Sequence, residues 1–111
     1  MKRFPSIKKN EEFRKIYRTG RSYADKMLVM YAVTNGTGSN RIGISASKKI
    51  GNSVVRHGLT RLVREAFRLN DEQVKQGYDI VVVIREGAVG ERYGSVSKSY
   101  MQLIKRHGIS L

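Results

Sequence analysis

A row of cationic side chains on one predicted helix is the feature of this sequence that carries the most chemistry. At about 100° per residue, four side chains fall within about 60° of one another: His57, Arg61, Arg64 and Arg68. Apolar residues lie almost diametrically opposite: Val55, Leu59, Leu62 and Ala66. The helix can therefore bury one side and present guanidinium groups on the other. Guanidinium groups bind phosphate with two parallel hydrogen bonds, so the row predicts a polyanionic ligand.

A basic turn precedes this helix. The stretch Gly43–Gly51 lacks the Gly-x4-Gly-Lys-Ser/Thr and Gly-x-Gly-x-x-Gly spacings of nucleotide-binding loops. Lys48, Lys49 and the start of the helix instead offer donors to nucleic-acid phosphates. A solvated helix face is the alternative, but such faces usually mix charges. Between Arg41 and Arg68 the only acid is Glu65, against seven cations: Arg41, Lys48, Lys49, Arg56, Arg61, Arg64 and Arg68.

Aromatic side chains accompany basic ones near the start of the chain. Phe13 and Tyr17 share a helical face, and Tyr31 lies on the next predicted element. One interpretation is core packing. The other is a stacking platform for unpaired bases, flanked by Lys9, Arg14 and Arg18.

Nothing in the sequence predicts a catalytic residue or a metal site of the protein's own. His57 and His107 are far apart and have no carboxylate at a ligand-like spacing. The chain has no cysteine, no His-Glu-x-x-His motif and no cluster of acids for a two-metal nuclease. A protein that cleaves RNA itself is therefore the weakest of the nucleic-acid hypotheses.

Overall composition points to the same ligand class. The 111 residues suffice for one domain, residues 1–111, and 22 Lys and Arg against 9 Asp and Glu give a net charge of +13. Such an excess predicts nucleic acid first and an anionic membrane second. The longest apolar stretches are far shorter than the roughly 20 residues of a membrane span, and no signal peptide is evident. With no cysteine, we expect a cytoplasmic protein.

The elements that must position these residues follow from periodicity and turn signals. Helices are expected at Asn10–Thr19, about Ser53–Leu69 and Ser95–Arg106. Strands are expected at Met27–Val33, Arg41–Ser47 and Asp79–Arg85. A strand-helix-strand run predicts two parallel strands joined by the basic helix. The fold class is α+β, an α/β sandwich in the order α-β-β-(β)-α-β-α, with a mixed sheet of about four strands.

Several segments resemble the protein subunit of bacterial ribonuclease P. They are Ile7–Gly20, Arg41–Arg56, Arg61–Phe67 and Tyr78–Arg85. The family's signature usually reads Arg-Asn-Arg, an apolar residue, Lys and Arg. Here the run is Arg56-His57-Gly58-Leu59-Thr60-Arg61, so the second Arg and the Lys of the signature are absent. Gly58 also costs the helix about 1 kcal/mol relative to Ala.

The resemblance implies a division of labour in an endoribonuclease. The large RNA subunit carries the active site and its Mg²⁺ ions and cleaves precursor tRNA at its 5′ end. The protein docks on that RNA, and the residues expected there are Lys48, Lys49, Asn52, Arg56, His57, Arg61, Arg64 and Arg68. A cleft between the first helix and the sheet holds the single-stranded 5′ leader, with Phe13, Tyr17, Tyr31, Arg41 and Ser45 expected there. The family also implies a left-handed crossover through the basic helix. A general RNA-binding module without a tRNA-processing role is the alternative.

Overall fold

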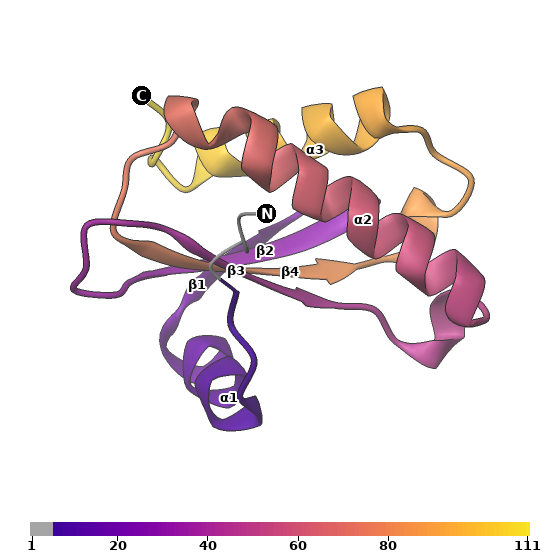
Figure 1. The fold of residues 1–111 in the computed structure, drawn as a ribbon, viewed down its shortest axis with the longest axis horizontal. Coiled ribbons are helices and arrows are strands. Elements are labelled where there is room, and N and C mark those ends of the chain that lie inside the picture. Colours follow the sequence, from indigo (N-terminus) through magenta and orange to yellow (C-terminus); the bar gives the residue numbers. More distant parts are fainter. Residues whose placement is uncertain (1–5) are drawn as a thin grey trace, which may run out of the picture.

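A four-stranded sheet separates one helix on its lower face from two helices on its upper face (Figure 1). The computed structural model describes residues 6–111. The helices are α1 (Asn10–Thr19), α2 (Ser53–Asn70) and α3 (Tyr93–Arg106). The strands are β1 (Arg21–Ala24), β2 (Leu28–Thr34), β3 (Arg41–Ser45) and β4 (Tyr78–Ile84). Short 3-10 turns occupy Lys48–Ile50, Asp71–Gln73 and Glu86–Ala88.

The sheet is mixed, with the strand order β1-β2-β4-β3. β2 runs antiparallel to both β1 and β4, whereas β3 and β4 are parallel. The helix α2 links these two parallel strands, so the predicted pair of parallel strands joined by the basic helix and the predicted fold class are confirmed. Because β3 is an outer strand, residues on both sides of it can reach the surface of the molecule.

The strand β1 is the element whose residues the sequence did not reveal. Three of its four residues are exposed, and only Tyr23 packs against the core. Its apolar content is therefore too low for an alternating pattern. Backbone pairing with β2 holds it in the sheet, from Arg21 opposite Ala32 to Ala24 opposite Val29.

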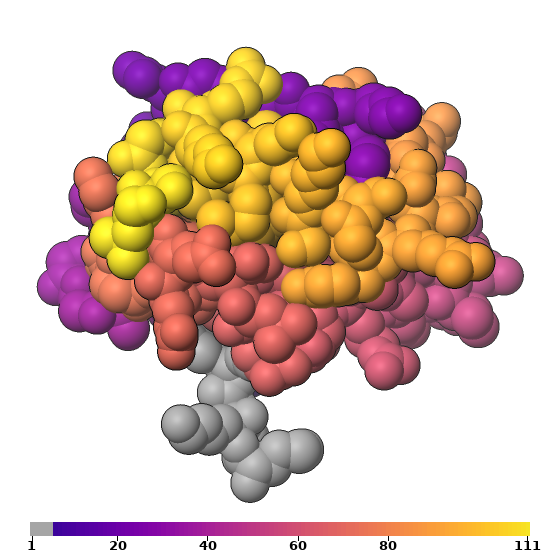
Figure 2. Space-filling view, turned by 90° about the horizontal axis from the view of Figure 1, so that it is seen from above, coloured from indigo at the N-terminus to yellow at the C-terminus, as the bar shows by residue number. Residues whose placement is uncertain are grey.

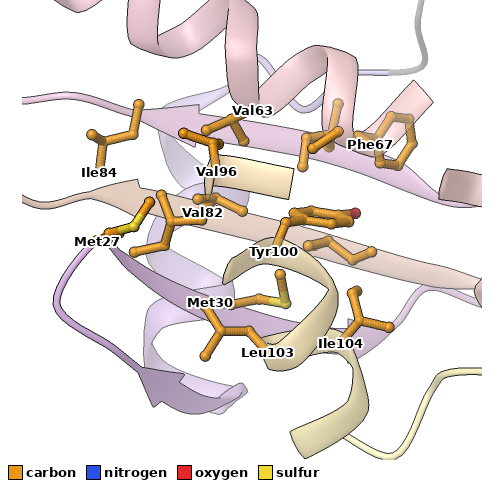
Figure 3. Packing of buried hydrophobic residues seen from close by; sticks show 14 of the residues in the cluster. Met27, Met30, Val63, Phe67, Val82, Ile84, Val96, Tyr100, Leu103 and Ile104 are labelled. Carbon is orange, nitrogen blue, oxygen red and sulfur yellow. The ribbon is translucent and has the colours of Figure 1, made fainter. Parts of the chain in front are cut away.

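The main core lies between the sheet and the pair α2 and α3, which lie side by side when the molecule is seen from above (Figure 2). The side chains of Met30 and Val82 rise from the sheet toward Tyr100 and Leu103 of α3 (Figure 3). Tyr100 is fully buried, and this burial raises the pKa of its hydroxyl far above the usual value. The buried faces of α2 and α3 thus fix which of their residues face solvent.

A second, smaller core joins α1 to the lower face of the sheet. Ile7, Ile16 and Val81 are buried there, and Phe13 and Tyr31 pack around them while remaining partly exposed. One short helix covers only part of a sheet face, which explains why these aromatic rings lie at the boundary between core and solvent.

Candidate nucleic-acid interface

The helix α2 is anchored at its start and along one face. The side-chain oxygen of Asn52 accepts a hydrogen bond from the backbone N–H of Val55 at 3.0 Å, which caps the helix. Four residues are buried beneath it: Leu59, Val63, Ala66 and Phe67. Val55 and Leu62 lie partly buried at the margin of this face. The opposite face is solvent-exposed and carries the row His57, Arg61, Arg64 and Arg68.

A groove runs between α2 and the outer strand β3. We call it the α2 groove, and its lining residues are Ile44, Ala46, Arg56, His57, Thr60, Arg61 and Arg64. Its β3 side is apolar and its α2 side is largely cationic. Within residues 6–111 the buried Nε of Arg56 has no hydrogen-bond partner. A buried donor without a partner is costly, so a movement of the Arg56 side chain that lets this N–H reach an acceptor, such as a phosphate oxygen, would be favoured.

The basic turn leads into the same region. Lys48 and Lys49 are exposed in the short 3-10 turn, and buried Ile50 fixes that turn to the core. Asn52 is exposed directly after it. The predicted docking residues therefore form one surface, extending from the turn along α2.

Arg68, at the far end of the row, is paired with a carboxylate of the protein. Its Nη2 lies 2.6 Å from Oε2 of Glu65, and its Nε donates to the other oxygen at 3.1 Å. The hydrogen bond from Arg68 lowers the pKa of Glu65, and the charges of Arg68 and Arg61 add to this effect. The free cationic character of the row is thus concentrated around Arg61 and Arg64.

A second groove lies on the other side of β3, against α1. We call it the α1 groove, and it is lined by Asn10, Phe13, Arg14, Tyr17, Ile44 and Ser45. Tyr17 is 37% exposed, and its ring meets that of Tyr31 edge-on at a centroid distance of 5.0 Å. Partial burial raises the pKa of the Tyr17 hydroxyl, although a hydrogen bond with Ser45 opposes the shift. Tyr17 therefore combines a fixed ring with an accessible surface.

Phe13 is set deeper than Tyr17 because β3 has a glycine beneath it. A Cβ at Gly43 would lie 2.8 Å from Cζ of Phe13, which is too close for any other residue without movement. Phe13 also packs in the small core with Ile7 and Ile16. Both interpretations of the aromatic residues thus apply, core packing mainly to Phe13 and surface accessibility mainly to Tyr17.

Arg41 lies apart from the α1 groove. It lines a separate hollow on the other flank of α1, together with Glu12, Lys15 and Asp79. Its Nη2 lies 2.6 Å from carboxylate oxygens of both Glu12 and Asp79, and its Nε donates to Asp79 at 2.8 Å. Among the predicted leader residues, the structure brings Phe13, Tyr17, Tyr31 and Ser45 together but gives Arg41 two carboxylate partners elsewhere.

The ion pairs of Arg41 shift the pKa values of Asp79 and of Arg41 itself. Burial alone would raise the pKa of Asp79, but hydrogen bonds from Arg41 and Asn35 outweigh burial, so the pKa lies below its usual value. The bonds to Asp79 and Glu12 raise the pKa of Arg41 further above neutrality. This cluster ties α1 to β3 and β4 and so fixes the side wall of the α1 groove.

Four groove residues were predicted neither as site residues nor as their basic neighbours: Asn10, Ile44, Ala46 and Thr60. The alternation of β3 predicts a core position for Ile44, and only the place of β3 at the sheet edge brings it into both grooves. Thr60 lies one turn from Arg56 and Arg64, so the helical spacing could have revealed it.

Across residues 6–111, no helix is both long and apolar enough to cross a bilayer.

Comparisons with known proteins converge on one family. The family model described as Ribonuclease P matches residues 1–108. A "Ribonuclease P protein component" from Lachnoclostridium phytofermentans is 49% identical and covers 94% of this chain and 90% of that protein. One from Clostridioides difficile is 43% identical, covering 98% and 96%.

Solved structures agree with these sequence relatives. The Staphylococcus aureus RNase P protein superimposes with a TM-score of 0.87 at 32% identity, covering 96% of this chain and 98% of that one. The RNase P protein from Thermotoga maritima gives a TM-score of 0.84 at 30% identity, covering 91% and 96%.

Proposed function

Because this chain belongs to the ribonuclease P protein family, we propose that its two grooves recognise two different RNAs during tRNA processing. The α2 groove binds the catalytic RNA, and the α1 groove binds the single-stranded 5′ leader of precursor tRNA. Membership confirms the resemblance seen in the sequence, and tRNA processing within ribonuclease P is the function of the family. A general RNA-binding module is not favoured.

The arrangement of Arg56, Arg61 and Arg64 around the α2 groove is the observation that carries the proposal. Two of these side chains are exposed, and the third has a buried N–H without a protein acceptor among residues 6–111. Guanidinium groups held on one helix suit the fixed phosphates of a folded RNA. Lys48 and Lys49, in the turn before α2, extend this surface.

The α1 groove suits an unpaired strand. Tyr17 offers a ring supported by Tyr31, and Arg14 lies in the same groove. Stacking of a base on an aromatic ring contributes about 1–3 kcal/mol and tolerates any sequence. A leader of variable sequence is the ligand that such a groove fits.

We further propose that the RNA and the substrate hold the catalytic Mg²⁺ ions. Residues 6–111 contain no group of three or more His, Asp or Glu placed to bind a metal. Two carboxylates on the other flank of α1, those of Glu12 and Asp79, are both bonded to Arg41. The protein's own contribution is then affinity for the substrate and neutralisation of phosphate charge, which lowers the Mg²⁺ concentration that the RNA needs.

One cleavage assay tests this division of roles. Precursor tRNA is incubated at low Mg²⁺ with the protein alone, with a ribonuclease P RNA alone, and with both. We expect 5′ cleavage only when both are present. Cleavage by the protein alone would mean that it carries its own active site. Binding of RNA without any stimulation of cleavage would contradict the proposal and favour a general RNA-binding module.

Paired variants separate the two grooves. Arg61→Gln/Arg64→Gln should weaken assembly with the ribonuclease P RNA, whatever the leader length of the substrate. Tyr17→Ala should leave assembly intact and weaken binding of precursor tRNA. Lys75→Gln, at an exposed lysine outside both grooves, is the control for removal of a charge. Identical behaviour of the two groove variants would contradict the assignment.

A further inference from the structure

We propose that the face where α3 meets β1 is a further RNA-binding surface, which contacts the phosphates of an RNA duplex independently of both grooves. We call it the α3–β1 face. All of its cations are exposed: Arg21, Lys26, Arg85, Lys98, Lys105 and Arg106. Seen from above, α3 has α2 along one side and purple N-terminal segments along the other, so this face points away from the α2 row (Figure 2).

The acid at the centre of this face, Asp25, offsets at most one of its six positive charges. One carboxylate oxygen of Asp25 accepts the backbone N–H groups of Met27 and Leu28, both at 2.8 Å. The other accepts the hydroxyl of Ser99 from α3. Burial opposes ionisation of Asp25, but these hydrogen bonds and the nearby Arg85 outweigh it and keep its pKa low. Asp25 is thus a structural link between the β1–β2 turn and α3, and none of its bonds within residues 6–111 is an ion pair.

Backbone carbonyls beside Asp25 fix two of the cations. Arg85 donates to the carbonyl of Asp25 at 2.7 Å, and Arg106 donates to that of Ala24 at 3.1 Å. Neither bond compensates the positive charge. Among residues 6–111, none of the six cations of this face is in an ion pair. The face therefore keeps a net positive charge, which favours a polyanion.

An aromatic cluster explains why this face recognises phosphate and not bases. The guanidinium carbon of Arg106 lies 4.8 Å from the centre of the Tyr23 ring, and the ring of His107 meets Tyr23 edge-on at 4.7 Å. Tyr23 is also partly buried against the main core. Its ring is thus engaged by Arg106, His107 and the core, and it offers a base less accessible surface than Tyr17 does.

His107 adds no charge to this face at neutral pH. Burial lowers its pKa, as do Arg21 and Arg106, although its bond with the carbonyl of Met30 acts in the opposite direction. The six Lys and Arg side chains are therefore the charged groups that a ligand meets. A surface of exposed cations, two of them fixed by backbone carbonyls, suits the regular backbone of a duplex better than an unpaired strand.

Binding of a plain RNA duplex tests the proposal. The ligand is a blunt-ended duplex of about 20 base pairs, somewhat more than the roughly 16 that one double-strand-binding domain spans. The background is Arg61→Gln/Arg64→Gln, which weakens the α2 groove. Onto it are added Lys26→Gln, Lys98→Gln and Lys105→Gln, three side chains without ion pairs among residues 6–111. The matched control adds Lys8→Gln, Lys15→Gln and Lys75→Gln, which removes the same charge from exposed positions outside both grooves.

The salt dependence of duplex binding is the measurement that decides whether the α3–β1 face contacts phosphates. We expect the slope of log K against log salt to fall by about 0.7–0.9 for each phosphate that the α3–β1 variant no longer binds, and to change much less in the control. Equal reductions of this slope in the two variants would mean that the α3–β1 face contributes only to the overall positive field of the protein, which would contradict the proposal. A background protein that no longer binds duplex, or an equal effect on a single strand of the same length, would also overturn the proposal. No ribonuclease P RNA or tRNA is present, so failure here leaves the proposed function untouched.

Discussion

Gly58→Arg should both stabilise the protein and strengthen its docking on ribonuclease P RNA. Gly58 lies inside α2, beside the cationic row, and is exposed. A Cβ built at this position meets no atom within 4 Å. The substitution therefore introduces no clash, and its effects come from helix propensity and charge alone.

The size of the stability change follows from two opposing effects. Replacing a glycine inside a helix by a strong helix former contributes about 0.8–1 kcal/mol. An arginine at position 58 also has Arg61 three residues along the helix, and such like-charge neighbours cost about 0.2–0.5 kcal/mol. We expect a net gain of about 0.5 kcal/mol for Gly58→Arg and of about 0.8–1 kcal/mol for Gly58→Ala. Urea unfolding can resolve the two, because both should shift the midpoint without changing the slope.

Measurements of RNA binding separate the effect of the added charge from the effect of greater helix stability. One additional phosphate contact should steepen the slope of log K against log salt by about 0.7–0.9 for Gly58→Arg. Gly58→Ala should leave the slope unchanged. Gly38→Arg, in the open loop between β2 and β3, adds the same charge at an uncrowded position away from the α2 groove.

Two results would refute this reasoning. If Gly58→Ala tightened RNA binding as much as Gly58→Arg, docking would be limited by helix stability and not by the number of cations. If Gly38→Arg matched Gly58→Arg, the RNA would respond to net charge and not to the row on α2. Loss of stability in Gly58→Ala would mean that the glycine is needed for a backbone conformation, although no residue of α2 has a positive φ.

Three further predictions concern the other parts of the structure. Tyr17→Ala should weaken binding of leader-containing precursor tRNA by about 1–3 kcal/mol in a fluorescence titration and leave mature tRNA unaffected, whereas equal weakening of both would indicate core packing. The pKa of His107 is lowered in the folded state, so the unfolded chain takes up this proton first and stability should decline as the pH falls below about 6.5; His107→Gln should remove that slope in chemical unfolding. The pKa of Asp79 is lowered in the folded state, so the Asp79 carboxylate stabilises the protein above about pH 4, and this stabilisation is lost as the pH falls below that value. Asp79→Asn should lower the free energy of unfolding by about 1–3 kcal/mol at pH 7 and should make it less dependent on pH in the acid range.

Periodicity predicted the elements that bury a continuous apolar stripe. The helix α2 has four buried residues at helical spacing, and the central strand β4 is apolar on both faces, so each leaves a strong local signal. The four residues of β1 leave none, because the strand depends on backbone pairing and on Arg106 of α3 for its place at the edge. Because the contacts that hold β1 come from other elements, the four residues of β1 contain no local pattern that predicts a strand.

The same distinction explains which cations were predicted correctly as exposed groups. Arg61 and Arg64 face solvent because the opposite side of their own helix is apolar, which is a local property. The partners of Arg41 lie 38 and 29 positions away along the chain, and only the fold brings them together. The pair of Arg68 and Glu65, three residues apart on one helix, was visible in the spacing, and it shortens the row at its end.

The position of β3 connects the two grooves to one another. The backbone N–H of Ile7 bonds the carbonyl of Ile42 at 2.8 Å, so the first described residues cover the outer edge of β3 at its start. Farther along the strand, Ile44 lines both grooves. RNA bound against α2 and RNA bound against α1 would therefore approach the same half of one strand from opposite sides. If the two grooves bind the RNAs proposed above, a single strand separates these ligands, and the protein would hold the 5′ leader close to the ribonuclease P RNA.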